Sequence, residues 1–248
     1  MHLIVTRPQA DAEELQRKLE VRGHRVTIAP LLDIRMGLPR PIPNRMYQAV
    51  LITSANGARA LADHPARARL LNKMVFAVGP QSRAAALAAG FMNVIEAGGD
   101  VTAIVAMVGR DLVAGAGPLL YLSGEETSGD LETVLGRSGY EVERVVMYAA
   151  VPAVDLPAPV VGIIKRRLVE GVLLYSRRTA KVWVKCVGAA RLENHVDGIP
   201  HFCLSAAVAS AIPLGWKIRI ATTASEQAML DLIEDEQRTT VEGSTDDG

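Results

Sequence analysis

The chain has 248 residues, of which 49% are hydrophobic, 22% charged and only 4% aromatic, so aliphatic side chains must build its core. This length favours two domains of roughly 100 to 130 residues each. The 27 basic and 27 acidic residues balance, which argues against the strongly basic surface of a protein that binds duplex nucleic acid or an anionic membrane. The two cysteines, Cys186 and Cys203, lack metal-ligand and disulfide-framework spacing, and no run is long enough to span a membrane, so we expect a cytoplasmic protein.

The N-terminal residues predict a strand, a helix and a second strand. The run HLIVTRP, from His2, is apolar and then turns polar, which is typical of a buried parallel strand followed by a loop. The segment DAEELQRKLEVRG places Leu15 and Leu19 on one helical face and Gly23 at the expected C-terminal end of the helix. The run HRVTIAPLLDI predicts the next strand, so these residues indicate a βαβ unit of a parallel sheet.

The same order of elements returns in the second half of the chain. Three blocks of the first half reappear in the same order, which indicates an internal repeat. The aligned residues are Leu3 with Leu120, Gly23 with Gly139, Val26 with Val142, Ser54 with Ser176, and Phe76 with Phe202. We therefore predict an α/β protein made of two similar domains, each with a parallel sheet.

Pro-rich segments at 35–45 and 151–159 each follow the first block of a repeat, as connections between domains often do. If both are crossovers, the chain begins one domain, builds the other completely and returns to finish the first, which is then discontinuous. The predicted parts are domain 1 at 1–34 and 157–233, domain 2 at 40–148, a two-stranded connection at 35–39 and 149–156, and a disordered tail at 234–248. Two such domains would face each other across a cleft.

Small and hydroxylated residues follow the predicted strands, where ligands bind in open parallel sheets. Backbone N–H groups at the helix N-termini of such loops suit anions. The same residue types are the commonest helix N-caps, so capping and ligand contact both stay open for each loop. The candidate loops are Thr6-Arg7-Pro8, Thr53-Ser54-Ala55-Asn56, Gly79-Pro80-Gln81-Ser82, Ser123-Gly124-Glu125, Tyr175-Ser176-Arg177 and Ser205-Ala206-Ala207.

The sequence contains no familiar cofactor or metal motif. Neither a phosphate-binding P-loop nor a dinucleotide fingerprint occurs, and the five histidines lack the short spacing of a zinc-binding helix. We therefore expect no cofactor and no metal. Tyr148 ends the predicted strand VERVVMY directly before a crossover, so its phenol either donates a proton in the cleft or packs in the core.

In their order and spacing, several of these segments resemble the uroporphyrinogen-III synthase family. The resemblance covers about 1–233 and lies in LIVTRP, GHRVTIAPLLDI, LITSANGARAL, VFAVGPQSRAAALAAGF, LLYLSGEETSGDL, YEVERVVMYAA and VLLYSRRTA. It implies two similar α/β domains and a cofactor-free conversion of the linear tetrapyrrole hydroxymethylbilane into uroporphyrinogen III. Ring D would be inverted through a spiro intermediate, as a step of tetrapyrrole and haem biosynthesis.

The resemblance also implies roles for individual residues. Tyr148 matches the family tyrosine proposed as the acid that helps the substrate hydroxyl to leave. Helix N-termini and arginines would hold the eight carboxylates of the substrate. The predicted substrate-binding residues are Arg7, Ser54, Asn56, Ser82, Ser123, Gly124, Ser176, Arg177 and Ser205.

Two segments depart from the family pattern. The second copy reads SAAVA where many members have a GPTTA-like loop, so Ser205 is left to supply the hydroxyl, and YSRRTA replaces the commoner TSP type. The SAAVA loop motivates an alternative, a non-catalytic two-domain cleft protein that binds a tetrapyrrole or a small anion. A third hypothesis is docking on another pathway enzyme through the polar tail, and a transient contact with the preceding enzyme stays open. Otherwise we expect a monomer with no nucleic-acid or membrane partner.

Overall fold

The computed structural model describes residues 1–37, 40–98, 101–127 and 129–243, with side chains through Thr239. Two compact units divide the chain. Unit 1 consists of Met1–Asp33 and Val151–Gly248, and unit 2 of Ile34–Ala150. Of the predicted segments, the connection at 35–39 includes residues 38 and 39 and the tail includes 244–248, and these seven positions lie outside the described residues.

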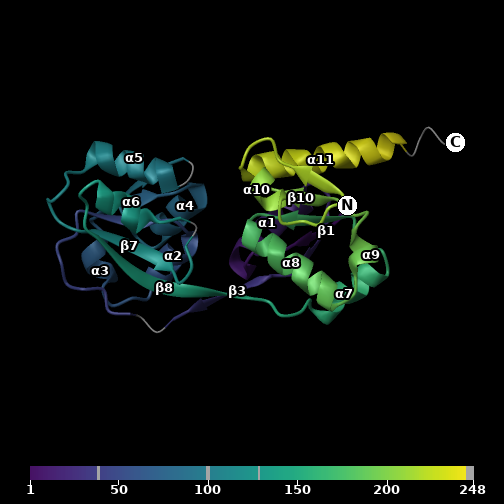
Figure 1. Cartoon of the computed structure of the whole chain (residues 1–248), viewed down its shortest axis with the longest axis horizontal. Helices are drawn as coiled ribbons and strands as arrows, with labels where there is room; N and C mark the ends of the chain where they lie inside the picture. Colours follow the sequence, from purple (N-terminus) through teal and green to yellow (C-terminus); the bar gives the residue numbers. More distant parts are fainter. Residues whose placement is uncertain (38–39, 99–100, 128, 244–248) are drawn as a thin grey trace. The chain divides into compact units, whose positions relative to one another are not determined.

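Within the described residues, unit 2 is built on a six-stranded sheet in the order β3-β8-β7-β4-β5-β6 (Figure 1). The strands are β3 (Leu32–Met36), β4 (Ala49–Ile52), β5 (Met74–Ala77), β6 (Asn93–Glu96), β7 (Leu119–Gly124) and β8 (Val142–Pro152). Strands β8, β7, β4, β5 and β6 pair in parallel, so their carboxyl ends lie at one edge of the sheet. The helices are α2 (Ala55–Leu61), α3 (Arg67–Leu70), α4 (Pro80–Ala88), α5 (Val101–Asp111) and α6 (Leu131–Arg137).

The described part of unit 1 contains a five-stranded parallel sheet in the order β11-β10-β9-β1-β2. The strands are β1 (His2–Val5), β2 (Arg25–Ile28), β9 (Gly171–Leu174), β10 (His201–Cys203) and β11 (Ile218–Ile220). The helices are α1 (Gln9–Val21), α7 (Ala158–Lys165), α8 (Arg177–Ala189), α9 (Glu193–Val196), α10 (Ala206–Ala209) and α11 (Glu226–Gly243).

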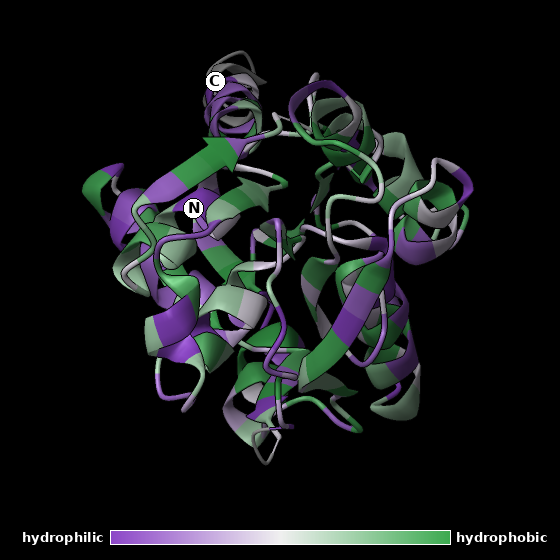
Figure 2. Cartoon of the chain, turned by 90° about the vertical axis from the view of Figure 1, so that its left-hand side faces the viewer, coloured by the Kyte–Doolittle hydropathy of each residue, from purple (hydrophilic) through white to green (hydrophobic). Residues whose placement is uncertain are grey.

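Alternating strand residues bury both faces of each sheet beneath helices. In unit 2, Val50 and Ile52 belong to a cluster with residues of α2 and α4, whereas Ala49 and Leu51 pack with residues of α5 and α6. Strand β4 is therefore apolar at every residue, as strands covered on both faces are. In Figure 2 the helices carry both hydrophobic and hydrophilic bands, as expected of helices with one side against a sheet.

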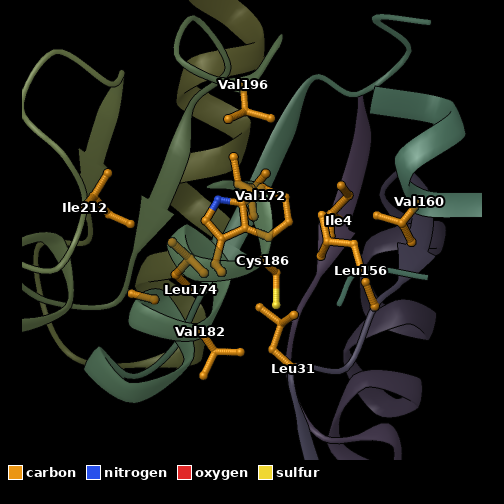
Figure 3. Packing of buried hydrophobic residues seen from close by; sticks show 14 of the residues in the cluster. Ile4, Leu31, Leu156, Val160, Val172, Leu174, Val182, Cys186, Val196 and Ile212 are labelled. Carbon is orange, nitrogen blue, oxygen red and sulfur yellow. The ribbon is translucent and has the colours of Figure 1, made fainter. Parts of the chain in front are cut away.

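The core of unit 1 likewise has two parts, one on each face of its sheet. Ile4 and Val172 pack with residues of α7 and α8, and Leu3 and Phe202 pack with residues of α1 and α11. Figure 3 shows Cys186 of α8 near Ile4 and Val172, in the first of these clusters. Both cysteines of the chain are free and buried, so they serve as small core residues.

The two sheets have corresponding strand orders. Read from the edge, β11-β10-β9-β1-β2 in unit 1 corresponds to β6-β5-β4-β7-β8 in unit 2, and the aligned sequence blocks fall on corresponding strands. Gly23 and Gly139, which align in the sequence, follow α1 and α6 with φ of +80° and +83°. Glycine is favoured in this left-handed conformation because it has no Cβ, so the same helix ending occurs in both units.

Two strands differ from the sequence prediction. The run HRVTIAPLLDI forms two strands, because β2 ends at Ile28 and β3 begins at Leu32 in the sheet of unit 2. Pro30 lies between them and has no N–H to donate to a sheet. Strand β8 continues to Pro152, so Tyr148 lies within the strand and does not end it. β3 is the neighbour of β8 in the sheet, and such a partner is not visible in the local pattern.

The prediction of disorder from residue 234 is wrong for the described residues, because α11 continues to Gly243. Its charged residues bind other elements of unit 1. The carboxylate of Glu236, which is 7% exposed, lies 2.7 Å from Nζ of Lys217 and 2.5 Å from Nε of Arg219. Glu234 pairs with Arg22 of the loop after α1 at 3.1 Å. The polar composition of this segment therefore did not indicate the helix, whose charged residues form ion pairs with other parts of unit 1.

Candidate functional site

The carboxyl edge of the unit 2 sheet gathers most of the predicted site residues. Ser54 follows β4, Ser82 lies in the first turn of α4 after β5, and Ser123 and Gly124 end β7. Because β4 pairs in parallel with both β5 and β7, these residues share one edge of the sheet. This edge is where open parallel sheets bind ligands.

Ser54 is the N-cap of α2. Its Oγ accepts a hydrogen bond from the backbone N of Asn56 at 3.3 Å. Asn56 is itself buried, and its Oδ1 accepts a hydrogen bond from Nη1 of Arg59 at 2.9 Å. Ser82 is also buried within α4. The capping role of Ser54 is confirmed, whereas contact between these side chains and a ligand stays a prediction.

Arg144 of β8 holds the end of β7, and the sequence analysis missed this residue. Its Nε donates to Oγ of Ser123 at 2.8 Å, and its Nη2 donates to the carbonyls of Gly124 at 2.9 Å and Glu125 at 2.7 Å. Ser123 Oγ in turn donates to the carbonyl of Gly124 at 3.0 Å. Arg144 lies opposite Tyr121 in the β7–β8 register, and only knowledge of that register could have revealed the contact.

Tyr148 is half-buried at the same edge, beside Gly124. Ser123 pairs with Val146 and Gly124 pairs with Tyr148, so the strand has a bulge at Met147. A bulge interrupts the regular alternation of side chains, and both Met147 and Tyr148 contact the core cluster on the α2 and α4 face. The backbone carbonyl of Tyr148 accepts a hydrogen bond from the N of Glu125 at 2.8 Å. Tyr148 therefore packs against the core on this face, and the acid role of its phenol stays a prediction.

A second phenol lies near this edge. The hydroxyl of Tyr121 on β7 is 2.8 Å from Oγ1 of Thr53, which directly follows β4. Burial raises the pKa of Tyr121, and its hydrogen bond with Thr53 acts in the opposite direction without cancelling this effect. Tyr121 therefore stays protonated at neutral pH. Tyr121 is a buried core residue, and the apolar run around it gives no sign of the contact with Thr53.

In unit 1, three predicted residues lie at the carboxyl edge of the sheet, after β9 and β10. Ser176 is the N-cap of α8, and its Oγ accepts a hydrogen bond from the N of Thr179 at 3.0 Å. Arg177 is the first residue of α8 and is exposed. Ser205 is at the N-cap position of α10 and makes no capping hydrogen bond with its side chain.

Arg7 follows β1 in unit 1, and its guanidinium is surrounded by side chains of the same unit. Its Nη2 is 3.2 Å from Oδ2 of Asp11, and its Nη1 is 3.3 Å from Oε2 of Glu226. Its guanidinium carbon is 4.7 Å from the centre of the Tyr175 ring, which is a cation–π contact. Burial raises the pKa of the Tyr175 phenol. Since two carboxylates already lie beside Arg7, its contact with a substrate carboxylate stays a prediction.

The predicted site residues thus form one group in each unit. Unit 2 holds Ser54, Asn56, Ser82, Ser123, Gly124 and Tyr148, and unit 1 holds Arg7, Ser176, Arg177 and Ser205. Across the described ranges, no three or more His, Cys, Asp or Glu side chains form a group that could hold a metal ion. No helix among those residues is both long and apolar enough to cross a membrane.

Comparison with solved structures shows a shared fold. The chain is similar to a uroporphyrinogen-III synthetase from Helicobacter pylori, with 17% identity and a TM-score of 0.65 over 95% of this chain and 99% of that one. It is also similar to a mutant uroporphyrinogen III synthase from Thermus thermophilus, with 14% identity and a TM-score of 0.58 over 98% and 99% of the two chains. No protein with a curated description matches the chain.

Comparison with family models gives the family. The model described as uroporphyrinogen-III synthase HemD matches residues 13–231, which is most of the chain. The matched range includes the carboxyl-edge residues of unit 2 and, apart from Arg7, those of unit 1. The chain therefore belongs to the uroporphyrinogen-III synthase family.

Proposed function

We propose that this protein is a uroporphyrinogen-III synthase, which closes hydroxymethylbilane to uroporphyrinogen III with inversion of ring D. The family match over residues 13–231 is the observation that carries the proposal. Hydroxyl side chains and helix N-termini at the carboxyl edges of both sheets support it, because they suit the carboxylates of such a substrate. The protein acts as a cytoplasmic monomer and needs no cofactor.

The chemistry requires positioning more than covalent catalysis. The hydroxyl leaves ring A as water, which gives an azafulvene cation. Ring D then attacks through its substituted carbon to form a spiro intermediate, which fragments and closes again in the inverted sense. Since the bilane closes unaided to the uninverted isomer, the protein must favour the hindered attack and assist the departure of the hydroxyl.

Tyr148 is the acid of this scheme. A phenol is protonated at neutral pH and can donate its proton to the departing hydroxyl. The phenolate regains a proton when the closing pyrrole loses one to restore its aromaticity, so the net change is the loss of water. Arg7, Arg177 and the predicted serines with Asn56 and Gly124 hold acetate and propionate arms.

The isomer of the product tests the proposal. Hydroxymethylbilane is added to the purified protein, and the uroporphyrinogens are oxidised and separated by chromatography. The proposal expects uroporphyrinogen III as the main product at catalytic protein concentrations. Uroporphyrinogen I alone, at the rate of the uncatalysed closure, would instead indicate a protein that binds a tetrapyrrole or small anion without turnover.

The role of Tyr148 is tested by Tyr148→Phe. The variant should lower kcat by about ten- to a hundredfold, at or below the lower end of the roughly 10²- to 10⁴-fold that a positioned acid contributes, because the hydroxyl is already a competent leaving group. Tyr140→Phe is the matched control, because it also removes one phenolic hydroxyl from unit 2. The Tyr140 hydroxyl bonds only backbone carbonyls of Val108 and Leu112 among the described contacts, away from the carboxyl edge. Equal kcat values for Tyr148→Phe and the wild type would reduce Tyr148 to a packing residue.

A further inference from the structure

Gly124 leaves a space that the ring of Tyr148 fills. A Cβ placed on Gly124 would lie 2.8 Å from Cζ of Tyr148 and 3.0 Å from both Cε2 and the hydroxyl oxygen. The first distance is shorter than real Cβ contacts and the other two are tighter than most of them, so either the backbone at residue 124 or the ring would have to move. A side chain at position 124 therefore competes with the phenol for the same space.

The backbone at Gly124 is held on both sides. Nη2 of Arg144 binds the carbonyls of Gly124 and Glu125 at 2.9 Å and 2.7 Å, and its Nε binds Ser123 at 2.8 Å. The N of Glu125 also donates to the carbonyl of Tyr148 at 2.8 Å. Moving this backbone would disrupt charge-assisted hydrogen bonds, which are stronger than neutral ones. The ring, which is half-buried at the edge, is the part that would move.

The constraint at Gly124 is steric and not conformational. Gly124 is absent from the glycines with positive φ, so its backbone conformation is open to an alanine. By contrast, Gly129 and Gly139 have φ of +120° and +83°, where any side chain would be strained. Replacing Gly124 by alanine thus changes the space beside the phenol and little else.

We infer that Gly124 is a positioning residue for Tyr148, an inference that rests on the proposed function. The missing side chain at position 124 and the fixed backbone around it set where the phenolic hydroxyl lies. Misplacing a catalytic group by about 1 Å can cost up to about a hundredfold in rate. The proposed acid therefore depends on a neighbour that has no functional group of its own.

A double-mutant cycle tests this inference with Gly124→Ala, Tyr148→Phe and the combined variant. Gly124→Ala should lower kcat by about five- to fiftyfold with KM within about twofold, because the phenol is displaced while the backbone groups of residue 124 and the other residues proposed to bind carboxylates are kept. In the Tyr148→Phe background the same alanine should lower kcat by less than about twofold, because no acid is left to displace. Losses that multiply, or a wild-type kcat for Gly124→Ala, overturn the inference.

Gly136→Ala is the matched control for the added methyl group. Gly136 lies in α6, and a Cβ there would meet nothing within 4 Å. This variant should keep the wild-type kcat in both backgrounds. A wild-type protein that makes no uroporphyrinogen III refutes the proposed function itself, whereas an active wild type with multiplicative losses refutes only the positioning role of Gly124.

Stability gives a second measurement if Gly124→Ala folds poorly. Tyr148→Leu removes the two ring carbons and the hydroxyl oxygen that an added Cβ would meet, so in that background Gly124→Ala should shift the urea midpoint by much less than in the wild type. An equal shift in both backgrounds means that the methyl group clashes with something other than the phenol ring, and it overturns the inference without any assay of activity.

Discussion

His201 in β10 makes the stability of unit 1 depend on pH. Its side chain is fully buried, and its Nε2 accepts a hydrogen bond from Nε1 of Trp183 at 3.1 Å. Since the indole can only donate, the ring proton of neutral His201 must lie on Nδ1, which is 3.3 Å from the carbonyl of Lys217. The ring of Trp216 lies 4.9 Å away between centroids. Adding a second proton would break the bond from Trp183 and bury a charge.

The size of the effect follows from the difference between folded and unfolded pKa values. Burial lowers the pKa of His201 from 6.5 to about 4, while the carbonyls of Lys217 and Ile199 act in the opposite direction. The unfolded ring returns to its ordinary pKa, so the unfolded state binds the extra proton as the pH falls below 6.5. The stabilisation is complete above pH 6.5 and is lost between pH 6.5 and 4. Between pH 7.5 and pH 5 this group alone should lower the free energy of unfolding by about 2 kcal/mol.

Urea unfolding at pH 7.5 and pH 5, followed by tryptophan fluorescence, measures this loss. Trp183 and Trp216 are the two tryptophans of the chain and both belong to unit 1, so the signal reports that unit. His201→Gln keeps an acceptor for Trp183 but does not titrate. His2 and His24, whose pKa values burial also lowers, contribute equally to both proteins and cancel. The wild type should lose about 2 kcal/mol more than the variant; equal losses would refute the argument.

Two further predictions concern helix ends and the last helix. Ser54→Ala should lower the free energy of unfolding by about 1 kcal/mol, whereas Ser205→Ala, which removes no capping bond, should change it by less than about 0.5 kcal/mol. Urea unfolding followed by far-ultraviolet circular dichroism measures both, because Ser54 lies in unit 2 and the tryptophans report only unit 1. Glu236→Gln should lower the free energy of unfolding by about 1 to 2 kcal/mol at pH 7, since Lys217 and Arg219 would lose their carboxylate. Burial acts to raise the pKa of Glu236, but its two cationic partners outweigh this effect and hold the pKa below 4.5. The difference in unfolding free energy between Glu236→Gln and the wild type should therefore vanish when the pH falls below that lowered pKa.

Local patterns were sufficient to predict many of the strands and helix ends. The apolar runs around Leu3 and Val50 form buried central strands, because both faces of these strands meet helices and no polar alternation is needed. Gly23 ends α1 with a positive φ, as a glycine after a periodic helix indicates. These features depend on residues within one turn or one strand, which is the range that a sequence pattern covers.

The features that local patterns did not predict depend on contacts between segments far apart in the sequence. Arg7 meets Glu226 across 219 positions of the sequence, and Thr53 meets Tyr121 across 68. Arg144 reaches the end of β7 only because of the register of the two strands. Residues beyond 233 look disordered by composition, yet Glu236 binds two cations of unit 1 and lies in a helix. Pairing partners of this kind cannot be identified from charge or polarity alone.

A serine at a sheet edge can cap a helix and bind a ligand with the same hydroxyl group. A capping hydroxyl such as that of Ser54 accepts one hydrogen bond through its oxygen and keeps its O–H as a donor, which is what a carboxylate requires. Ser123 differs, because its Oγ accepts from Arg144 and donates to the carbonyl of Gly124. We therefore expect the Ser54 hydroxyl to bind a substrate carboxylate more readily than that of Ser123, which together with Arg144 holds the backbone beside Tyr148.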